Sequence, residues 1–307
     1  MDATTDRNRW RVLRDMLRPE RLTSIVDIGA NPINPAPYDA LLSENLACVY
    51  GFEPQPAAFQ RLEENPHPNR VILPYAIGDG TRGTLHICEH SGFTSLLEPN
   101  PEMLEYLGQW KQYMEVIETA TVDTKMLDDI DEIKHVDLVK IDIQGGELSV
   151  FKNAENVLKN AIAVFTEVAA IPLYKNQPLL HDQLQLLSQH DYCLHKFDFF
   201  KSKSLNSKFA RFLRQKHHQN QLVDGDAILI RGLPKLEKLP EEELKHLAIL
   251  ADAIMKSYDL VLKILEIFYE RGLIAQEQQI LSYCDLLPMA RTRHLRLERR
   301  RLDKGTT

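Results

Sequence analysis

The amino-acid sequence predicts an α/β protein of the doubly wound kind, with a largely parallel sheet. Its clearest strand is a β-branched apolar run that ends in Asp27-Ile28 and opens into the turn Gly29-Ala-Asn31. A helix over 37–45, a strand over 48–53 and a helix over 57–64 follow. Strands that alternate with helices in this way form parallel sheets.

The same alternation continues through the middle of the chain. We expect strands at 70–77, 84–88, 116–122, 136–142, 161–168, 192–199 and 226–231, and helices at 102–114, 125–130, 147–159 and 179–190. After Pro240, residues 241–271 contain neither proline nor glycine and carry apolar side chains every three or four positions, which is typical of an amphipathic helix. We expect that helix to break near Ser257.

These patterns predict three parts of the chain. Residues 1–22 contain a short amphipathic helix, over 7–18, which would cover an edge of the sheet as an N-terminal helical cover. Residues 23–232 would form the ligand-binding domain, and 240–307 a C-terminal helical appendage with a second helix over 274–287 and a basic tail over 291–304. A helical hairpin cannot bury its apolar stripe alone, so it would pack on the α/β domain or form a homodimer with a second copy.

Composition limits the classes of protein to consider. The chain has 307 residues, 44% of them hydrophobic and 26% charged, with a net charge of −7, which gives it no overall bias toward nucleic acid or anionic membranes. Its cysteines are widely scattered and lack metal-ligand spacing, so no metal site is predicted. The sequence shows no signal peptide and no apolar run of membrane-spanning length. We therefore expect a cytoplasmic protein with no membrane span.

Two acidic side chains at strand ends predict a nucleoside site. Ligands of doubly wound sheets bind beyond the carboxyl ends of the strands, where Asp27 and Gly29 would stand. Glu53 follows Gly29 by 24 positions, at the end of the next strand, which is the spacing of an acid that binds ribose hydroxyls. A dinucleotide fits less well, because its pyrophosphate needs a turn with several glycines and this turn has one.

A second acidic strand end lies in the middle of the chain. Residues 136–142 form an apolar strand that ends in Asp142, and Gly145-Gly146 follow before a helix. Two glycines in a strand–helix turn permit close approach of the backbone to a ligand. The next strand carries Glu167 near its end.

Four motifs at successive strand ends resemble those of one family. "VDIGAN", "GFEPQP", "AIGDG" and "DLVKIDIQGGE" are similar, in this order, to the FkbM-type family of class I S-adenosylmethionine-dependent methyltransferases, over roughly residues 22–231. The resemblance implies a Rossmann-like fold: a mostly parallel seven-stranded sheet with helices on both faces and an antiparallel last strand. It also implies methyl transfer to a hydroxyl group, often on a sugar or a polyketide.

The resemblance also implies roles for individual residues. Asp27, Gly29 and Asn31 would face the methionine end of S-adenosylmethionine, and Glu53, with Pro54 beside it, the ribose. Asp142 would lie near the sulfonium and the acceptor. The residues expected on the adenine side are Ile77, Gly78 and Asp79.

Two departures from the family keep another function open. The turn after Asn31 is Pro32-Ile33-Asn34-Pro35, and Gln144 stands where the family commonly has glutamate. The first interpretation is an O-methyltransferase that acts by in-line transfer on a carbohydrate or related natural product. The alternative is a catalytically silent, cofactor-binding scaffold in a glycan-assembly complex. An NAD-dependent enzyme is disfavoured by the missing multi-glycine turn.

An alcohol acceptor loses its proton during methylation, so a general base assists. Asp142 and Glu167 are the catalytic candidates because both stand at strand ends, although Asp142 could instead only hold the cofactor. Residues 201–220 carry lysines and arginines but no acid. This segment is either a solvated loop or a site that captures a small-molecule or glycan acceptor with an anionic group. We expect no nucleic-acid partner, because only Phe209 and Phe212 could stack on bases there.

Overall fold

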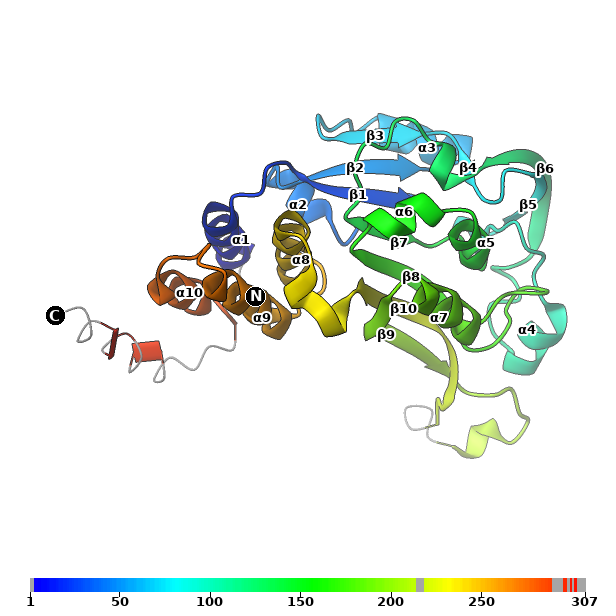
Figure 1. Ribbon diagram of the computed structural model, residues 1–307. Helices are drawn as coiled ribbons and strands as arrows, with labels where there is room; N and C mark the ends of the chain where they lie inside the picture. The colour runs from blue at the N-terminus through cyan, green and yellow to red at the C-terminus, as the bar shows by residue number, and fades with distance from the viewer. Residues whose placement is uncertain (1–2, 214–217, 289–294, 297–298, 300, 303–307) are drawn as a thin grey trace. The chain divides into compact units, whose positions relative to one another are not determined.

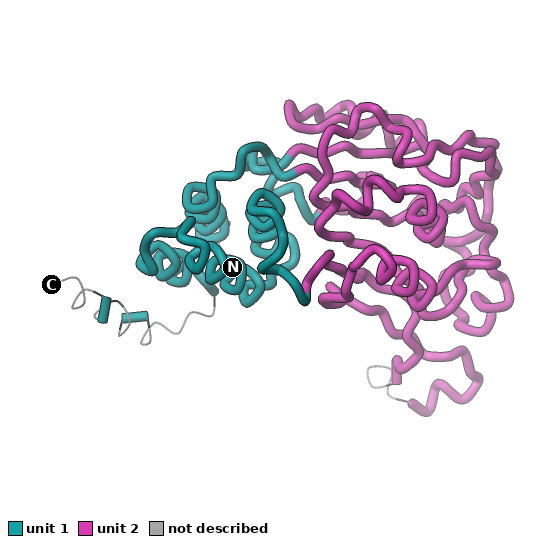
Figure 2. Tube along the Cα trace, in the orientation of Figure 1, with its two compact units in different colours: residues 1–23, 37–47, 234–307 teal, residues 24–36, 48–233 magenta. Residues whose placement is uncertain are grey.

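The computed structural model describes residues 3–213, 218–288, 295–296, 299 and 301–302. Contacts divide the chain into two compact units, coloured separately in Figure 2. Unit 1 comprises Met1–Thr23, Pro37–Ala47 and Pro234–Thr307, and unit 2 comprises Ser24–Ala36 and Cys48–Leu233. The three-part domain organisation expected from the sequence stays a prediction.

Unit 2 is built on a seven-stranded sheet with the strand order β3-β2-β1-β7-β8-β10-β9 (Figure 1). Its strands, in chain order, are β1 (Thr23–Ile28), β2 (Ala47–Phe52), β3 (Arg70–Leu73), β7 (Leu138–Ile141), β8 (Ala163–Ala169), β9 (Tyr192–Lys203) and β10 (Gln221–Arg231). The pairs β1–β7, β7–β8 and β2–β3 are parallel, whereas β10 runs antiparallel to both β8 and β9. The predicted α/β fold is confirmed: a mostly parallel seven-stranded sheet with an antiparallel last strand, flanking helices and C-terminal helices.

The strand expected over 70–77 is divided between two sheets. It ends as β3 at Leu73 and resumes as β4 (Ala76–Ile77), which joins β5 (Arg82–Cys88) and β6 (Val116–Lys125) in a three-stranded sheet of order β4-β6-β5. Pro74 stands at the division and has no amide hydrogen to donate to a neighbouring strand.

The helices of unit 2 are α3 (Pro56–Glu63), α4 (Pro101–Leu107), α5 (Glu147–Lys152), α6 (Glu155–Asn160) and α7 (Leu180–Gln189). Short 3₁₀ turns lie at Ser91–Phe93, Leu127–Asp129 and Ala210–Phe212. The helix expected over 102–114 ends early because Gly108 takes a left-handed conformation, φ +65°, at its C-terminal end.

The single helix expected over 147–159 is instead two helices. Asn153 and Ala154 interrupt it, since both lie outside the helical region of backbone angles. The carboxylate of Asp128 accepts hydrogen bonds from the amides of Asn156 (2.9 Å) and Val157 (3.0 Å), at the start of α6. A carboxylate that binds these otherwise unpaired amides stabilises a new helix start.

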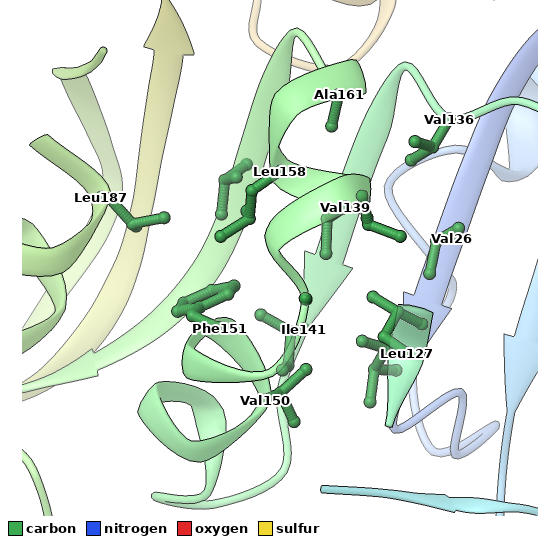
Figure 3. Packing of buried hydrophobic residues seen from close by; sticks show 14 of the residues in the cluster. Val26, Leu127, Val136, Val139, Ile141, Val150, Phe151, Leu158, Ala161 and Leu187 are labelled. Atoms are coloured by element: carbon green, nitrogen blue, oxygen red, sulfur yellow. The ribbon is translucent and has the colours of Figure 1, made fainter. Parts of the chain in front are cut away.

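The α5–α7 face of the sheet carries the main apolar core. Side chains from α5 and α6, such as Phe151 and Leu158, pack against the strand residues Val26 and Val139 (Figure 3). All four are essentially inaccessible to solvent. Because side chains alternate along a strand, burying these residues leaves Asp27 and Lys140 on the opposite face of β1 and β7.

Unit 1 is helical. It contains α1 (Ala3–Leu17), α2 (Asp39–Ser43), α8 (Glu241–Ala253), α9 (Tyr258–Glu270) and α10 (Glu277–Cys284), with a 3₁₀ segment at Leu233–Lys238. The break expected near Ser257 is confirmed between α8 and α9. The basic tail expected over 291–304 falls mostly outside the described residues.

One buried carboxylate joins three helices of unit 1. Asp252 on α8 pairs with the Arg9 guanidinium at 2.7 Å and accepts hydrogen bonds from Trp10 Nε1 (2.7 Å) and the Tyr283 hydroxyl (2.6 Å). These partners lie on α1 and α10. Since the carboxylate is fully buried, its pairing with a cation and two further donors offsets the cost of removing it from water.

Among the described residues, no helix is both long and apolar enough to cross a membrane.

The ends of β1 and β7 meet closely at Gly29. Its φ is +81°, and a Cβ at this position would lie 2.1 Å from the carbonyl oxygen of Asp142. The amide of Asp142 in turn donates to the carbonyl of Ile28 at 3.0 Å. Glycine is required here both by its backbone conformation and by the lack of space.

We predict that Gly29→Ala lowers the free energy of unfolding by more than about 3 kcal/mol, because the added methyl forces the two strand ends apart. Gly80→Ala is the matched control in the same unit. Gly80 has the same φ of +81°, but its Cβ would meet only the flexible Met126 side chain, at 3.2 Å. The control should cost about 1–2 kcal/mol. Urea unfolding of both variants measures the difference, and equal losses would contradict the steric explanation.

Candidate active site

The carboxyl ends of three strands converge in unit 2. The amides of Gly29 and Ala30, after β1, both donate to the carbonyl of Phe52 at the end of β2, at 3.1 and 3.0 Å. Asp142, after β7, bonds to the last residue of β1. This backbone pattern brings the ends that carry Asp27, Glu53 and Asp142 together, as the sequence predicts.

Lys140 lies beside Asp27 in the sheet. The two residues are direct partners in the β1–β7 register, and Nζ of Lys140 lies 3.0 Å from Oδ1 of Asp27, which is 2% exposed. Burial disfavours the charged form of Lys140, but the carboxylates of Asp27, Asp142 and Asp226 outweigh it and raise the pKa of the ammonium group. Lys140 therefore stays charged and supplies positive charge to a group of acids.

Glu53 is buried at the end of β2. One of its carboxyl oxygens accepts a hydrogen bond from the amide of Gln55 at 2.8 Å. Burial raises the pKa of Glu53 to about 7, and the charge of Asp27 adds to this, while the hydrogen bond and Lys140 work against it. Pro54 follows directly and is half-buried.

Glu167 on β8 faces Asp226 on β10. The two residues are register partners in the antiparallel pair. Burial, with the nearby charges of Asp142 and Glu147, raises the pKa of Glu167 well above its ordinary value. Burial, and again Asp142, raises the pKa of Asp226 to about 7. The site therefore holds carboxyl groups that exchange protons near neutral pH.

The turn after Asp142 is held by Glu147, the first residue of α5. Its buried carboxyl group accepts hydrogen bonds from the amides of Ile143 (3.0 Å) and Gly145 (3.1 Å). Burial raises the pKa of Glu147 to about 7 even though these hydrogen bonds favour the charged form. The conformation of the turn thus depends on a side chain of the following helix.

Gln144 links Asp142 to a buried tyrosine. Its Nε2 donates to Oδ1 of Asp142 at 2.8 Å, and its Oε1 accepts from the Tyr174 hydroxyl at 3.1 Å. The same hydroxyl lies 3.0 Å from the carbonyl of Phe93. The amide hydrogen bond fixes the orientation of the Asp142 carboxylate without adding a second negative charge beside it.

Of the remaining predicted site residues, Asn31 lies after β1, and Ile77, Gly78 and Asp79 lie at the end of β4 or directly after it. Oδ1 of Asn31 is buried and has no hydrogen-bond partner within the described part of the chain. Ile77 is part of the apolar core, and a Cβ at Gly78 would lie 2.9 Å from Thr124. Asp79 is exposed, and its Oδ1 accepts hydrogen bonds from both the amide (3.0 Å) and the hydroxyl (2.6 Å) of Thr81. Its binding role stays a prediction.

Sequence reasoning missed Lys140, Glu147, Tyr174 and Asp226. A lysine inside the otherwise apolar run over 138–141, two residues before an acid, was a detectable signal, because an unpaired lysine does not belong in a buried strand. Asp226 could not be placed beside Glu167 without the order of the strands. Nothing in the sequence pairs Tyr174 with Gln144.

We predict that Glu53 makes stability depend on pH. The ordinary pKa of 4.5 rises to about 7 in the folded protein, so between these values the folded state binds more protons and stability falls as pH rises. From about pH 5 to about pH 8, the free energy of unfolding of wild type should fall by about 2 to 3 kcal/mol more than that of Glu53→Gln. Glutamine keeps the acceptor for Gln55 but cannot ionise. Urea unfolding at both pH values tests this, and parallel losses in the two proteins would contradict it.

Comparisons with known proteins identify the family of this chain. Residues 27–194 match the family described as "Methyltransferase FkbM domain". The relative 2-O-methyltransferase NoeI of Sinorhizobium fredii (strain NBRC 101917 / NGR234) is 30% identical over an alignment of 176 residues, and the match covers 53% of this chain and 70% of the relative. The family match covers more than half of the chain.

Solved structures of methyltransferases match more weakly. The precorrin-6y C5,15-methyltransferase of Geobacter metallireducens is 11% identical, with a TM-score of 0.32 over 72% of this chain and 87% of that one. TrmK of M. capricolum, in complex with S-adenosylhomocysteine, is 10% identical, with a TM-score of 0.32 over 85% and 97%. From its family match and its relative, the chain belongs to the FkbM methyltransferase family, whose enzymes use S-adenosylmethionine.

Proposed function

We propose that this methyltransferase acts on a hydroxyl group of a carbohydrate or a related natural product. The observation that carries the proposal is the group of acids near the carboxyl ends of the parallel strands, where Glu167 on β8 and Asp226, within β10, face each other with raised pKa values. A general base works best when its pKa is close to the pH at which the enzyme acts. The name of the relative, a 2-O-methyltransferase, supports an oxygen acceptor.

The residues at the ends of β1 and β2 fit S-adenosylmethionine. Oδ1 of Asn31, which has no hydrogen-bond partner among the described residues, and the buried carboxyl group of Glu53 are hydrogen-bond acceptors. They suit the ammonium and ribose hydroxyl donors of the cofactor. The cofactor supplies an electrophilic methyl group on a sulfonium centre. In this proposal Asp27, Gly29 and Asn31 hold the methionine end and Glu53 the ribose.

The protein's own task is then to position the acceptor and to remove its proton. Glu167 is the proposed base, because its neighbours disfavour a further negative charge and so keep its proton affinity high. Asp142 is held in place by Gln144, and we assign it to the border between cofactor and acceptor. An anionic acceptor, a cytoplasmic location and a homodimer through the C-terminal helices stay predictions.

We predict that calorimetric titration detects micromolar binding of S-adenosylmethionine and S-adenosylhomocysteine, and none of NAD. Glu53→Ala should weaken binding by more than about tenfold, since it removes hydrogen bonds to a charged group. Glu118→Ala, at an exposed carboxylate on β6, is the control and should bind as wild type does. If Glu53→Ala binds as well as wild type, Glu53 does not contact the cofactor. Binding of NAD without S-adenosylmethionine would contradict the assignment of this site to S-adenosylmethionine.

We predict that Asp142→Asn and Glu167→Gln each reduce turnover by more than about tenfold, while Glu167→Gln keeps its affinity for the cofactor. Asparagine at position 142 still accepts the hydrogen bond from Gln144. Asp142→Asn therefore removes the negative charge of the side chain but keeps its orientation. The assay follows S-adenosylhomocysteine release and methylated product with a panel of monosaccharides and oligosaccharides, paired with deoxy analogues. In wild type, activity should rise with pH as the base loses its proton, and Glu167→Gln should lose that rise.

One result would argue against the proposed function, and another against the assigned base alone. Cofactor binding without methylation of any sugar, polyketide or other alcohol tested would favour the silent scaffold. Near-normal turnover of Glu167→Gln would exclude Glu167 as the base while leaving the reaction itself in place.

A further inference from the structure

The connection between β9 and β10 carries an unusual surface. We propose that its residues 205–213, here called the 205–213 segment, dock the enzyme on an anionic membrane surface. In Figure 1 the described part of this connection extends beyond the end of the β9–β10 pair. The inference rests on side-chain exposure and charge, and it does not depend on the proposed reaction.

Large apolar side chains of the segment are turned to solvent. Phe212 is 72% exposed and Phe209 59%, and their rings stack on each other with centroids 6.5 Å apart. Leu205 and Leu213 are also exposed. Exposing four large apolar side chains within nine residues gains the folded monomer nothing, so such a patch marks an interaction surface.

Cations stand beside both rings. Nζ of Lys208 lies 5.1 Å from the ring centroid of Phe209, and the Arg211 guanidinium lies 5.0 Å from that of Phe212. No aspartate or glutamate occurs between Lys201 and Leu222. The segment is therefore positive although the whole chain has a net charge of −7. Arg214 and Lys216, in the same connection, lie outside the described residues.

The segment has a defined conformation. Asn206 donates its backbone amide to the carbonyl of Tyr106 (3.0 Å) and its side-chain amide to that of Glu105 (3.3 Å), both on α4. The amide of Phe212 bonds to the carbonyl of Phe209 at 3.0 Å within a 3₁₀ turn. A pre-formed turn loses less conformational entropy on binding than a disordered loop does.

Phenylalanine and leucine next to lysine and arginine suit the boundary between lipid headgroups and acyl chains. There the apolar side chains leave water while the cations bind anionic headgroups. A free phosphate or sugar phosphate would engage only the cations and would leave the rings exposed. Single-stranded nucleic acid would need open ring faces, whereas these rings already have each other and a cation as neighbours. A lipid surface is the partner that uses both features.

The test is co-sedimentation of the full chain with lipid vesicles. We expect binding to vesicles of phosphatidylcholine with phosphatidylglycerol, no binding to phosphatidylcholine alone, and weaker binding in about 0.5 M than in about 0.1 M salt. Lys208→Gln with Arg211→Gln, and separately Phe209→Ser with Phe212→Ser, should each weaken binding by about tenfold or more. These side chains are exposed, so the variants should fold normally, which circular dichroism checks.

Ile117→Ser is the matched control, because Ile117 is an equally exposed apolar side chain, at 60%, on β6 of the same unit. It should bind vesicles as wild type does. The proposal is overturned if anionic vesicles do not bind, or if either double variant binds as well as the control. Binding of single-stranded RNA, but not of vesicles, that is lost in both double variants would also overturn it, in favour of a nucleic-acid partner.

Discussion

The ion pair between Lys140 and Asp27 is the interaction on which the site depends. Asp27, Asp142 and Asp226 act together on the pKa of Lys140, whose ammonium group lies 3.0 Å from Asp27. A buried carboxylate without a compensating cation is costly, and removing one partner of a buried pair costs more than the pair contributes. Lys140 therefore makes it possible for acids from several strands to share one small region.

The single positive charge of Lys140 offsets only part of the negative charge of the buried acids. The remainder determines the pKa values of these acids. Glu53 and Asp226 have pKa values near 7, and that of Glu167 is raised as well, because burial and mutual repulsion disfavour their charged forms. A glutamate in place of Gln144 would add one more charge next to Asp142. Glutamine instead donates a hydrogen bond to Asp142 while its other end is held by Tyr174. The departure from the family's usual residue thus fits the electrostatics of this site.

The sequence predicted the candidate site residues that lie on parallel strands and missed Asp226, which lies on the antiparallel strand β10. Asp27, Glu53, Asp142 and Glu167 could be predicted because each follows or ends an apolar run, and parallel strands put such ends at one edge of the sheet. Asp226 lies within its strand and meets Glu167 only because β10 inserts between β8 and β9. The breaks at Pro74 and Asn153 depend on local geometry, including a cap from Asp128, that periodicity does not report.

The antiparallel direction of β10 also explains how the site can hold a proton. Only the last residues of a parallel strand lie at the edge of the sheet where the site is, because the chain leaves the sheet there. The antiparallel strand β10 begins at this same edge. Its residues Asp224 and Asp226 are therefore paired with Ala169 and Glu167, close to the end of β8. The charge of Asp226 is among the causes that raise the pKa of Glu167, so these two carboxyl groups do not titrate independently. In the proposed reaction, the acceptor's proton would pass to Glu167, and its charge state would depend on acids carried by two strands of opposite direction.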